Sequence, residues 1–445
     1  MSIDRTDEHE YDALRMRQWL AGEADARGLS RRHLLRLGTA AAAAVPLAGV
    51  AATPAAANPA AGNPGAANPA AAPAAADPAA VAGAAAEPTG PIRKPLPPEL
   101  FYTYGTNAET RWEAMAGQGY YTPADRFFVR NHTRTPAIDP ATWRLQLFGS
   151  GLRHGPVELS LQDLRRLPSD TYDAAIECTG NGRSFFTSQQ GQTVSGTAWK
   201  LGAVGVARWR GVRLSTVLRR AGIRPDAVDV LPEGLDDEWV TGGVNLGRVR
   251  RPLPVAKAMR DVLLAYEMNG EPLPPDHGFP VRVVVPGWIG IAAIKWLGRI
   301  EVSTGPLFSP WNTQFYRLFG PGYPADGELL SRQVVKSAFE LPWQGTLTGG
   351  RTHVLHGRSW SGNGPIRRVE VSTDGGASWH PATPTGRRGG PWQQWSYRWR
   401  PPAPGAYTLR ARAVDATGAG QPDVTPFNTL GYLFDAVVAH PVTVA

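Results

Sequence analysis

The chain contains a single cysteine, Cys178, among 445 residues. One thiol excludes an internal disulfide, a cysteine-rich zinc site and an iron–sulfur cluster, because each of these needs at least two. Any folded domain must therefore be held by its apolar core. The cysteine can be a buried apolar thiol, a catalytic nucleophile, or the one protein ligand of a metal whose other ligands come from elsewhere. A Gly-Asn-Gly turn and then Arg183 follow it. These neighbours favour a polar, cationic surrounding in which a thiolate is stabilised.

The N-terminal region has the features of an export signal. The segment from Ser30 to Arg36 reads Ser-Arg-Arg-His-Leu-Leu-Arg and precedes an apolar run from Leu37 to Ala52. It resembles a twin-arginine signal; the alternative is a basic helical arm. The run is short for a membrane span. We therefore expect residues 1–52 to be a signal region, and the acidic segment before Ser30 to lie outside the fold. The expected location is periplasmic or extracytoplasmic, either soluble after cleavage or tethered by an uncleaved signal.

Composition separates a linker from the folded part. Residues 53–90 are almost entirely Ala, Pro, Gly and Asn, which offer little apolar surface to bury, so this tract is predicted to be a disordered linker. The remaining residues, 91–445, have a length that suits two domains. The formal net charge of +8 could steer anionic substrates or acidic partners. Nucleic acid is not an expected partner, because the arginines are dispersed and no known binding motif appears.

The pattern of elements divides the folded part near residue 327. Before this point strands and helices are mixed: strands are expected at 142–148, 171–178, 262–267 and 281–285, and helices at 161–167 and 215–221. After it the helical signals vanish, and short strands are expected at 353–360, 366–372, 392–399 and 407–415. The predicted fold class is α+β. A mixed α+β catalytic domain over 91–327 is followed by an all-β, immunoglobulin-like sandwich over 328–445.

Several motifs occur in order along the first domain. They are Phe128-Val129-Arg130-Asn131-His132, the Cys178 turn, Gly234-Leu235-Asp236, the run from Leu263 to Gly270, the run from Asp276 to Gly287, and Ile294 to Arg299. Followed by a β-sandwich, this series resembles the sulfite oxidase family of molybdopterin-dependent oxidoreductases. The resemblance covers about residues 95–445, and the motifs are specific only as a set.

The resemblance implies a molybdenum–molybdopterin cofactor, with one molybdenum per chain, and no haem in this chain. Cys178 would be the metal ligand, and a soft thiolate suits a sulfur-bound redox metal. Cofactor-binding positions implied by the family are Phe128, Val129, Arg130, Asn131, His132, Asp236, His277, Arg282, Ala293, Ile294 and Lys295. The positions implied for catalysis are Arg130, Arg183 and Tyr316. Each assignment has an alternative: the arginines can be surface charges or structural ion pairs, and Tyr316 can be a core aromatic residue.

The sequence departs from the family pattern at two positions. Animal sulfite oxidases carry a further arginine in a Trp-Asn-Leu-Arg-Gly motif of the second domain, and here Leu430 stands at that position. Gly182 also replaces an arginine that is common next to Arg183. Loss of a cation weakens the binding of a small dianion, because charge-assisted contacts are among the stronger ones.

The function that the resemblance implies is oxidation of a small oxyanion, most simply sulfite to sulfate. Electrons would pass to an external acceptor such as a c-type cytochrome, and the second domain would form a homodimer. The alternatives within the family are a sulfane dehydrogenase subunit and a nitrate or sulfoxide reductase. From other classes, the alternatives are a cofactor-free binding protein and a hydrolase with Cys178 as its nucleophile.

Overall fold

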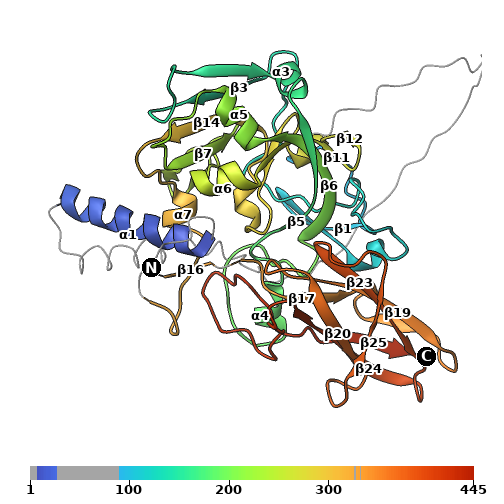
Figure 1. The fold of residues 1–445 in the computed structure, drawn as a ribbon. Coiled ribbons are helices and arrows are strands. Elements are labelled where there is room, and N and C mark those ends of the chain that lie inside the picture. Colours follow the sequence, from blue (N-terminus) through green and yellow to red (C-terminus); the bar gives the residue numbers. More distant parts are fainter. Residues whose placement is uncertain (1–7, 28–89, 325–326, 331) are drawn as a thin grey trace, which may run out of the picture.

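The computed structural model describes residues 8–27, 90–324, 327–330 and 332–445. The predicted export motif and apolar run, and the predicted linker up to residue 89, lie outside the described residues. The described chain forms a mixed N-terminal part and a β-rich C-terminal part (Figure 1). Among the described helices none combines the length and the apolar character that a membrane crossing requires.

Two sheets build the mixed part. The first has the strand order β10-β7-β14-β3-β4, in which only β14 and β3 run parallel. Its strands are β10 (Leu253–Pro254), β7 (Asp229–Gly234), β14 (Leu297–Ser303), β3 (Arg144–Phe148) and β4 (Val157–Ser160). The second is antiparallel, with the order β12-β11-β6-β5 and β13 paired to β11. Its strands are β12 (Glu271–Pro272), β11 (Leu263–Met268), β6 (Val204–Arg213), β5 (Ser169–Glu177) and β13 (Arg282–Val284).

Short helices and two-stranded ribbons connect these sheets. The α-helices are α3 (Leu161–Arg165), α4 (Ser184–Ser188), α5 (Leu214–Arg220), α6 (Val255–Arg260) and α7 (Pro310–Thr313). The 3₁₀ turns are η1 (Trp112–Met115), η2 (Pro275–His277) and η3 (Gly290–Ala292). The ribbons are β1 (Phe101–Tyr104) with β2 (Asn107–Thr110), β8 (Val240–Thr241) with β9 (Val244–Asn245), and β15 (Arg317–Leu318) with β16 (Glu328–Leu329).

Local sequence explains helix α3. Ser160 caps it: the Ser160 hydroxyl accepts from the Asp163 N–H (3.1 Å), and the Asp163 carboxylate accepts from the Ser160 N–H (3.0 Å). This reciprocal pair satisfies two N–H groups that the first turn leaves without partners. Pro168 lies beyond the end of the helix and cannot continue it. The helix expected over 161–167 is therefore confirmed, two residues shorter than predicted.

The C-terminal part consists of two packed sheets. One has the order β17-β19-β23-β22 and the other β18-β25-β24-β20-β21. Their strands are β17 (Lys336–Phe339), β19 (His353–Trp360), β23 (Trp392–Trp399), β22 (Thr383–Thr385), β18 (Gly345–Leu347), β25 (His440–Val444), β24 (Gly405–Asp415), β20 (Ile366–Ser372) and β21 (His380–Pro381). Phe339, Leu355 and Trp395 of the first sheet share a core with Val371 and Leu409 of the second. The sheets therefore face each other, as expected for a β-sandwich.

The two parts are joined by a shared apolar cluster. Phe185, Phe186 and Val204 of the mixed part pack with Trp360 and Phe434 of the β-rich part, and all are buried. The second part therefore packs directly behind helix α4, which follows the turn that carries Cys178.

One expectation about the N-terminus is wrong. The acidic segment before Ser30 was expected to lie outside the fold, but residues 8–27 form helix α1 (Glu8–Arg27), which lies against α7 (Figure 1). Tyr11, Asp12, Arg15 and Met16 are buried there. The helix lacks a clear apolar stripe, and two of its buried side chains are charged and pair with charges of the mixed part. Composition alone could not reveal these partners.

Candidate functional site

Cys178 lies in a tight turn directly after strand β5. Its N–H donates to the carbonyl of Ala203 (2.9 Å), and its own carbonyl accepts from the N–H of Asn181 (2.9 Å). The Asn181 side chain secures the turn, because it donates to Glu177 Oε1 (2.9 Å) and accepts from the Ala203 N–H (3.0 Å). Gly182 follows with φ +96°, and a Cβ there would come within 2.9 Å of a side chain of the β-rich part. Glycine is therefore required at this position.

The thiol of Cys178 is half-buried and lines a pocket whose empty space, including the part open to solvent, is about 720 Å³. The lining includes the predicted metal ligand, one predicted catalytic tyrosine and all predicted cofactor-binding positions except Val129. These are Cys178, Tyr316, Phe128, Arg130, Asn131, His132, Asp236, His277, Arg282, Ala293, Ile294 and Lys295.

The segment before His132 explains why Val129 is the exception. Val129 exchanges two backbone hydrogen bonds with Ala108 (2.8 and 2.9 Å), which holds this segment extended. Successive side chains of an extended chain point to opposite sides. Phe128 and Arg130 therefore face the pocket, whereas Val129 is fully buried in a small core with Phe101. The backbone of Val129 holds the segment extended, and its side chain does not line the pocket.

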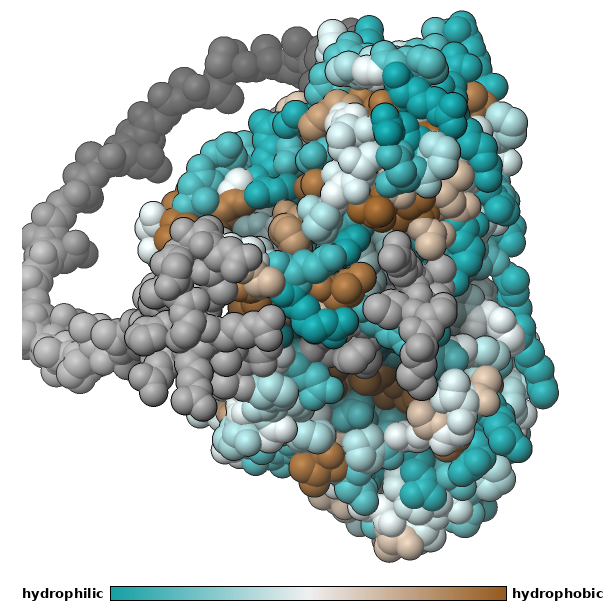
Figure 2. All heavy atoms as spheres, turned by 60° about the vertical axis from the view of Figure 1, so that its left-hand side comes forward, coloured by the Kyte–Doolittle hydropathy of each residue, from teal (hydrophilic) through white to brown (hydrophobic). Residues whose placement is uncertain are grey.

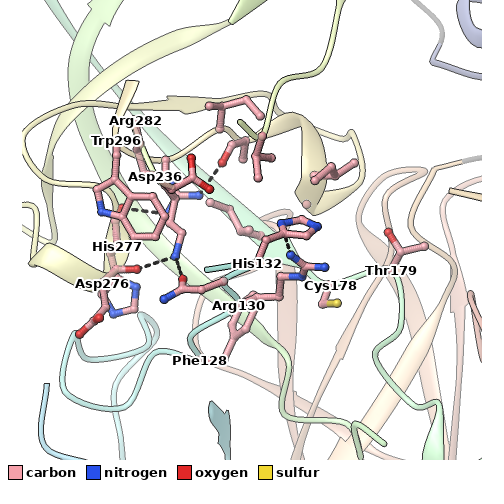
Figure 3. Close-up of a pocket in the computed structure, with 18 of the residues that line it drawn as sticks. Phe128, Arg130, His132, Cys178, Thr179, Asp236, Asp276, His277, Arg282 and Trp296 are labelled. Carbon is pink, nitrogen blue, oxygen red and sulfur yellow. Dashed lines mark hydrogen bonds between the residues drawn. The ribbon is translucent and has the colours of Figure 1, made fainter. Parts of the chain in front are cut away.

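Two buried cations form one end of the pocket, near Asp276, His277 and Trp296 (Figure 3). Lys295 donates to the carbonyl of Asp276 (2.8 Å) and also to the Asn131 side chain. Arg282 donates to the carbonyls of His277 (3.1 Å) and Ala293 (3.1 Å). Burial lowers the pKa of Arg282 to about 9 and the pKa of Lys295 well below its ordinary value. These shifts show that nearby carboxylates do not fully compensate the burial of the two cations.

His277 and Arg282 each have a buried nitrogen that no described residue pairs. His277 Nε2 and Arg282 Nε are buried and have no hydrogen-bond partner in the described part of the chain. Burial, followed by the charges of Lys94 and Lys295, lowers the pKa of His277 well below its ordinary value, so its ring is neutral. Buried polar groups are normally paired, and Arg282 Nε–H can only donate, so it indicates a missing acceptor in the pocket. The unpaired nitrogen of the neutral His277 ring indicates a missing partner whose kind depends on the tautomer.

His132 gives a second indication of a missing acceptor. Trp311 Nε1 donates to His132 Nε2 (3.1 Å), and the Arg130 guanidinium contacts His132 Nδ1. Burial, then Arg130, lowers the pKa of His132 well below its ordinary value, so the ring is neutral. Both partners can only donate, but a neutral imidazole has one accepting nitrogen. An acceptor beside Arg130 would resolve this conflict. Figure 3 shows Arg130, His132 and Cys178 close to one another.

Two carboxyl groups complete the polar lining. Asp276 accepts from the backbone N–H groups of Arg93 (3.0 Å) and Lys94 (2.7 Å) and from the Thr135 hydroxyl (2.5 Å), so it fastens the start of the domain to the pocket. Asp236 follows strand β7, and burial raises its pKa to about 6. Near neutral pH a carboxyl group with this pKa can either accept or donate a hydrogen bond.

Arg183 is placed differently from the other predicted residues. It is buried but is not among the residues that line the pocket. Its guanidinium donates to the carbonyls of Leu430 (2.8 Å) and Thr197 (2.9 Å). A Cβ added at Gly180 or Gly196 would come within 2.5–2.8 Å of this guanidinium, so the absence of side chains there creates its slot. Its predicted role as a cation that contacts substrate stays a prediction.

The loop of the β-rich part that contains Leu430 closes over this region. The Leu433 N–H donates to the carbonyl of Thr179 (3.0 Å), next to the metal-ligand position. Tyr432 stacks on Tyr316, with ring centroids 5.5 Å apart, and lies under the Arg183 guanidinium. Tyr316 has a positive φ of 61° and is buried. The second part of the chain therefore supports the wall that carries Tyr316.

Eight lining residues were not predicted as site residues. They are Phe127, Ile176, Thr179, Val249, Asp276, Gly290, Ile291 and Trp296. Asp276 and Thr179 are sequence neighbours of predicted site residues. This proximity in the sequence could have identified them as further site residues. Val249 gave no signal, because only the fold brings it to this pocket.

The site fits a molybdenum–molybdopterin group. It offers one thiol, and the described residues contain no cluster of three His, Cys, Asp or Glu side chains that could hold a metal alone. A metal at Cys178 would therefore need ligands from a cofactor. The unused Arg282 Nε–H donor and the conflict at His132 require acceptors, and the unpaired nitrogen of His277 requires a polar partner. The phosphate and the pterin heteroatoms of such a group would supply them.

Comparisons with known proteins agree with this site. Residues 132–311 match the family model of the oxidoreductase molybdopterin binding domain, and residues 334–442 match that of the Mo-co oxidoreductase dimerisation domain. The chain is 37% identical to sulfite oxidase of Gallus gallus over 354 residues, covering 74% of each chain. It is 39% identical to mitochondrial sulfite oxidase of Homo sapiens over 352 residues, covering 74% of this chain and 63% of that protein.

A solved structure shows the same architecture. The sulfane dehydrogenase SoxCD from Paracoccus pantotrophus matches with a TM-score of 0.63 and 29% identity, covering 74% of this chain and 82% of that chain. The chain belongs to the sulfite oxidase family of molybdopterin-dependent oxidoreductases. Membership makes molybdenum–molybdopterin the cofactor of its first domain. The chain spans less than two thirds of the length of the mammalian sulfite oxidases that it matches.

Proposed function

We propose that this protein oxidises a small sulfur oxyanion, most simply sulfite to sulfate, with molybdenum at Cys178. The observation that carries the proposal is that the only thiol and Arg130 line one pocket, whose remaining donors need an acceptor-rich group. The sequence identity to proteins named sulfite oxidase supports a sulfur oxyanion as the substrate class. When bound, the cofactor supplies the two-electron redox chemistry and the oxygen transfer.

The side chains of the pocket would bind the cofactor and the substrate. Arg282, Lys295 and His277 would hold the anionic and heteroatom-rich part of the cofactor, because they place two cations and an unpaired ring nitrogen at one end of the pocket. Arg130 would attract the anionic substrate toward the thiol side. Burial raises the pKa of Tyr316, so its hydroxyl stays protonated and can donate a hydrogen bond to substrate.

Replacement of the thiol tests this proposal. Wild-type protein from a host that makes the pterin should contain about one molybdenum per chain, because the site offers a single protein ligand. Cys178→Ser should lose turnover, measured as sulfite oxidation with an artificial one-electron acceptor, while circular dichroism stays unchanged. Thr187→Ser, at an exposed position in α4, serves as the control. Undiminished oxidation by Cys178→Ser would contradict the proposed ligand. Sulfite oxidation by metal-free wild type would contradict the molybdenum proposal.

A sulfane dehydrogenase activity is the second candidate. It is favoured by the structural match to SoxCD and by Leu430, which replaces the additional arginine of animal sulfite oxidases. A pocket with one cation fewer is less selective for a small dianion. Steady-state oxidation of sulfite and of a sulfane-sulfur compound by one preparation would decide between the candidates, since the true substrate should have the higher kcat/KM.

We further propose how the protein assembles and where it acts. The match of residues 334–442 to a dimerisation domain supports a homodimer, which sedimentation equilibrium would detect. We propose that this β-rich part is an immunoglobulin-like sandwich.

Because two electrons must leave the site after each turnover, we propose an external carrier such as a c-type cytochrome. The twin-arginine motif supports export of the folded protein.

A further inference from the structure

Helix α1 is attached to the first domain by an unusual set of side chains. Tyr11, Asp12, Arg15 and Met16 lie on one face of the helix, and each is less than 7% exposed. The helix contacts α7 and β16, and in Figure 1 it is the blue helix beside α7. Figure 2 brings this side of the molecule forward and shows apolar residues in separate patches rather than in one apolar face.

The first attachment is a bidentate ion pair. Arg15 Nε donates to Asp229 Oδ2 (2.7 Å) and Arg15 Nη2 donates to Asp229 Oδ1 (2.5 Å). Asp229 is fully buried at the start of strand β7 and also accepts from the N–H of Leu307 (2.8 Å). If the helix only touched the surface, these charges would stay in water, where an ion pair adds little to the stability of the contact. Here the helix covers a buried carboxylate and supplies the opposite charge.

The second attachment leads toward the pocket. Asp12 forms a buried ion pair with Arg251, and Arg251 also donates to the carbonyl of Trp311 in α7. The indole of Trp311 donates to His132 Nε2 (3.1 Å), and His132 in turn contacts Arg130. An unbroken series of polar contacts therefore runs from helix α1 to the arginine that faces the thiol.

We propose that helix α1 is a resident part of the working enzyme, and that Asp12 is a positioning residue. Through Arg251 and Trp311 it holds His132 in the orientation that sets Arg130 beside Cys178. The helix lies upstream of the twin-arginine motif, so the proposal requires the uncleaved form of the signal region, because cleavage after the apolar run would remove residues 8–27. The docking of α1 is independent of the proposed reaction, whereas its effect on substrate binding rests on the proposed function.

Hydrogen exchange of the full-length, cofactor-loaded protein tests the docking. Amides of residues 10–22 should exchange at least about a hundredfold more slowly than in an unfolded peptide, because the helix must open before they exchange. Arg15→Ala should remove most of this protection. Arg17→Ala, at an exposed position on the same helix, should leave it intact. Unprotected amides in wild type, or equal protection in the two variants, would overturn the proposal.

The positioning role of Asp12 is tested by hydrogen exchange and by steady-state kinetics of its variants. Asp12→Ala should raise the exchange of residues 310–316 about tenfold and raise the KM for sulfite more than it lowers kcat, because Arg130 binds substrate rather than performs the oxidation. Asp12→Asn keeps an accepting oxygen and should restore part of both effects. Molybdenum content should stay at the wild-type level. Unchanged exchange in Asp12→Ala would refute the positioning role even if sulfite proves not to be the substrate.

Discussion

At the scale of single residues, Arg183 and Leu430 connect the region of the Cys178 turn to the second domain. Arg183 lies in a slot left by Gly180 and Gly196 and donates to the backbone carbonyl of Leu430. The loop position where animal sulfite oxidases carry an arginine is therefore close to this part of the site even though its side chain is apolar here. The cationic field at the substrate end of the pocket rests on Arg130.

A charge restored at position 430 should improve the binding of sulfite. Leu430→Arg adds one charge-assisted contact, which contributes about 1.5–3 kcal/mol. This corresponds to a KM for sulfite roughly ten- to a few hundred-fold lower. Thr429→Arg adds the same charge one residue earlier, at an exposed position, and should change KM little. If wild type already has a micromolar KM, another cation replaces the missing arginine and the argument from Leu430 fails.

The second prediction for a single residue is that Glu109 makes the free energy of unfolding depend on pH. Glu109 is fully buried and accepts from the N–H groups of Lys200 (2.9 Å) and Gly202 (2.7 Å), and burial raises its pKa to about 7. The unfolded chain releases this proton near pH 4.5, so between that pH and 7 the folded state binds more protons. The contribution of Glu109 to the free energy of unfolding should therefore fall by up to about 1.4 kcal/mol per pH unit as pH rises through this window.

Denaturant unfolding of Glu109→Gln at pH 5 and pH 7 measures this effect. The variant should have a smaller difference in unfolding free energy between the two pH values than wild type, because its side chain does not titrate. Glu113→Gln, at a half-buried position nearby, is the control. An equal pH dependence in wild type and Glu109→Gln would show that Glu109 does not titrate in this range.

At the scale of elements, the end of strand β5 and strand β17 are joined by one ion pair. Lys336 Nζ donates to Glu177 Oε1 (2.8 Å) and to the carbonyl of Asn181 (2.8 Å), and both charged side chains are buried. The pair therefore links the β-rich part to the turn that holds Cys178. Local patterns predicted eight of the described strands and the helices α3 and α5, but they did not predict this link. The immunoglobulin-like assignment also stays a prediction, since two packed sheets occur with several strand orders.

Breaking this pair should destabilise the protein and loosen the Cys178 turn. Lys336→Ala leaves the Glu177 charge buried without its cation, which costs about 3–5 kcal/mol. We expect a lower unfolding midpoint and a reduced molybdenum content. The double variant Glu177→Gln, Lys336→Met removes both charges and should recover part of the stability, because no ion stays buried alone. A Lys336→Ala protein as stable as wild type would show that the pair is not formed.

At the scale of the whole molecule, the described chain combines a docked N-terminal helix, a mixed domain and a β-rich domain. The predicted export motif lies between the first two, outside the described residues. Replacement of Arg31 and Arg32 by lysine should leave a folded, molybdenum-containing precursor in the cytoplasm, because the twin-arginine route depends on the arginine pair. Fractionation and immunoblotting would check this. Normal export of the double variant would show that the protein uses another route or none.

The sequence alone predicted eight of the described strands, two helices and twelve of the residues that line the pocket. Alternation and capping act over a few residues, so strands such as β3 and the capped helix α3 were readable locally. The motif series placed Cys178, Arg130, His277, Arg282 and Lys295 in one family-defined set, and the fold brings these five residues to one pocket.

Only the tertiary structure decided the roles that depend on distant partners. Arg183 points toward the second domain because Gly180 and Gly196 leave a slot for it and the carbonyl of the distant Leu430 accepts a hydrogen bond from it. Val129 turns away from the pocket because a bridge to Ala108 fixes its register. Helix α1 docks because Asp229 and Arg251, more than 200 residues later, supply buried charges of opposite sign. Contacts of such large sequence separation leave no local pattern, so they appear only when the chain is folded.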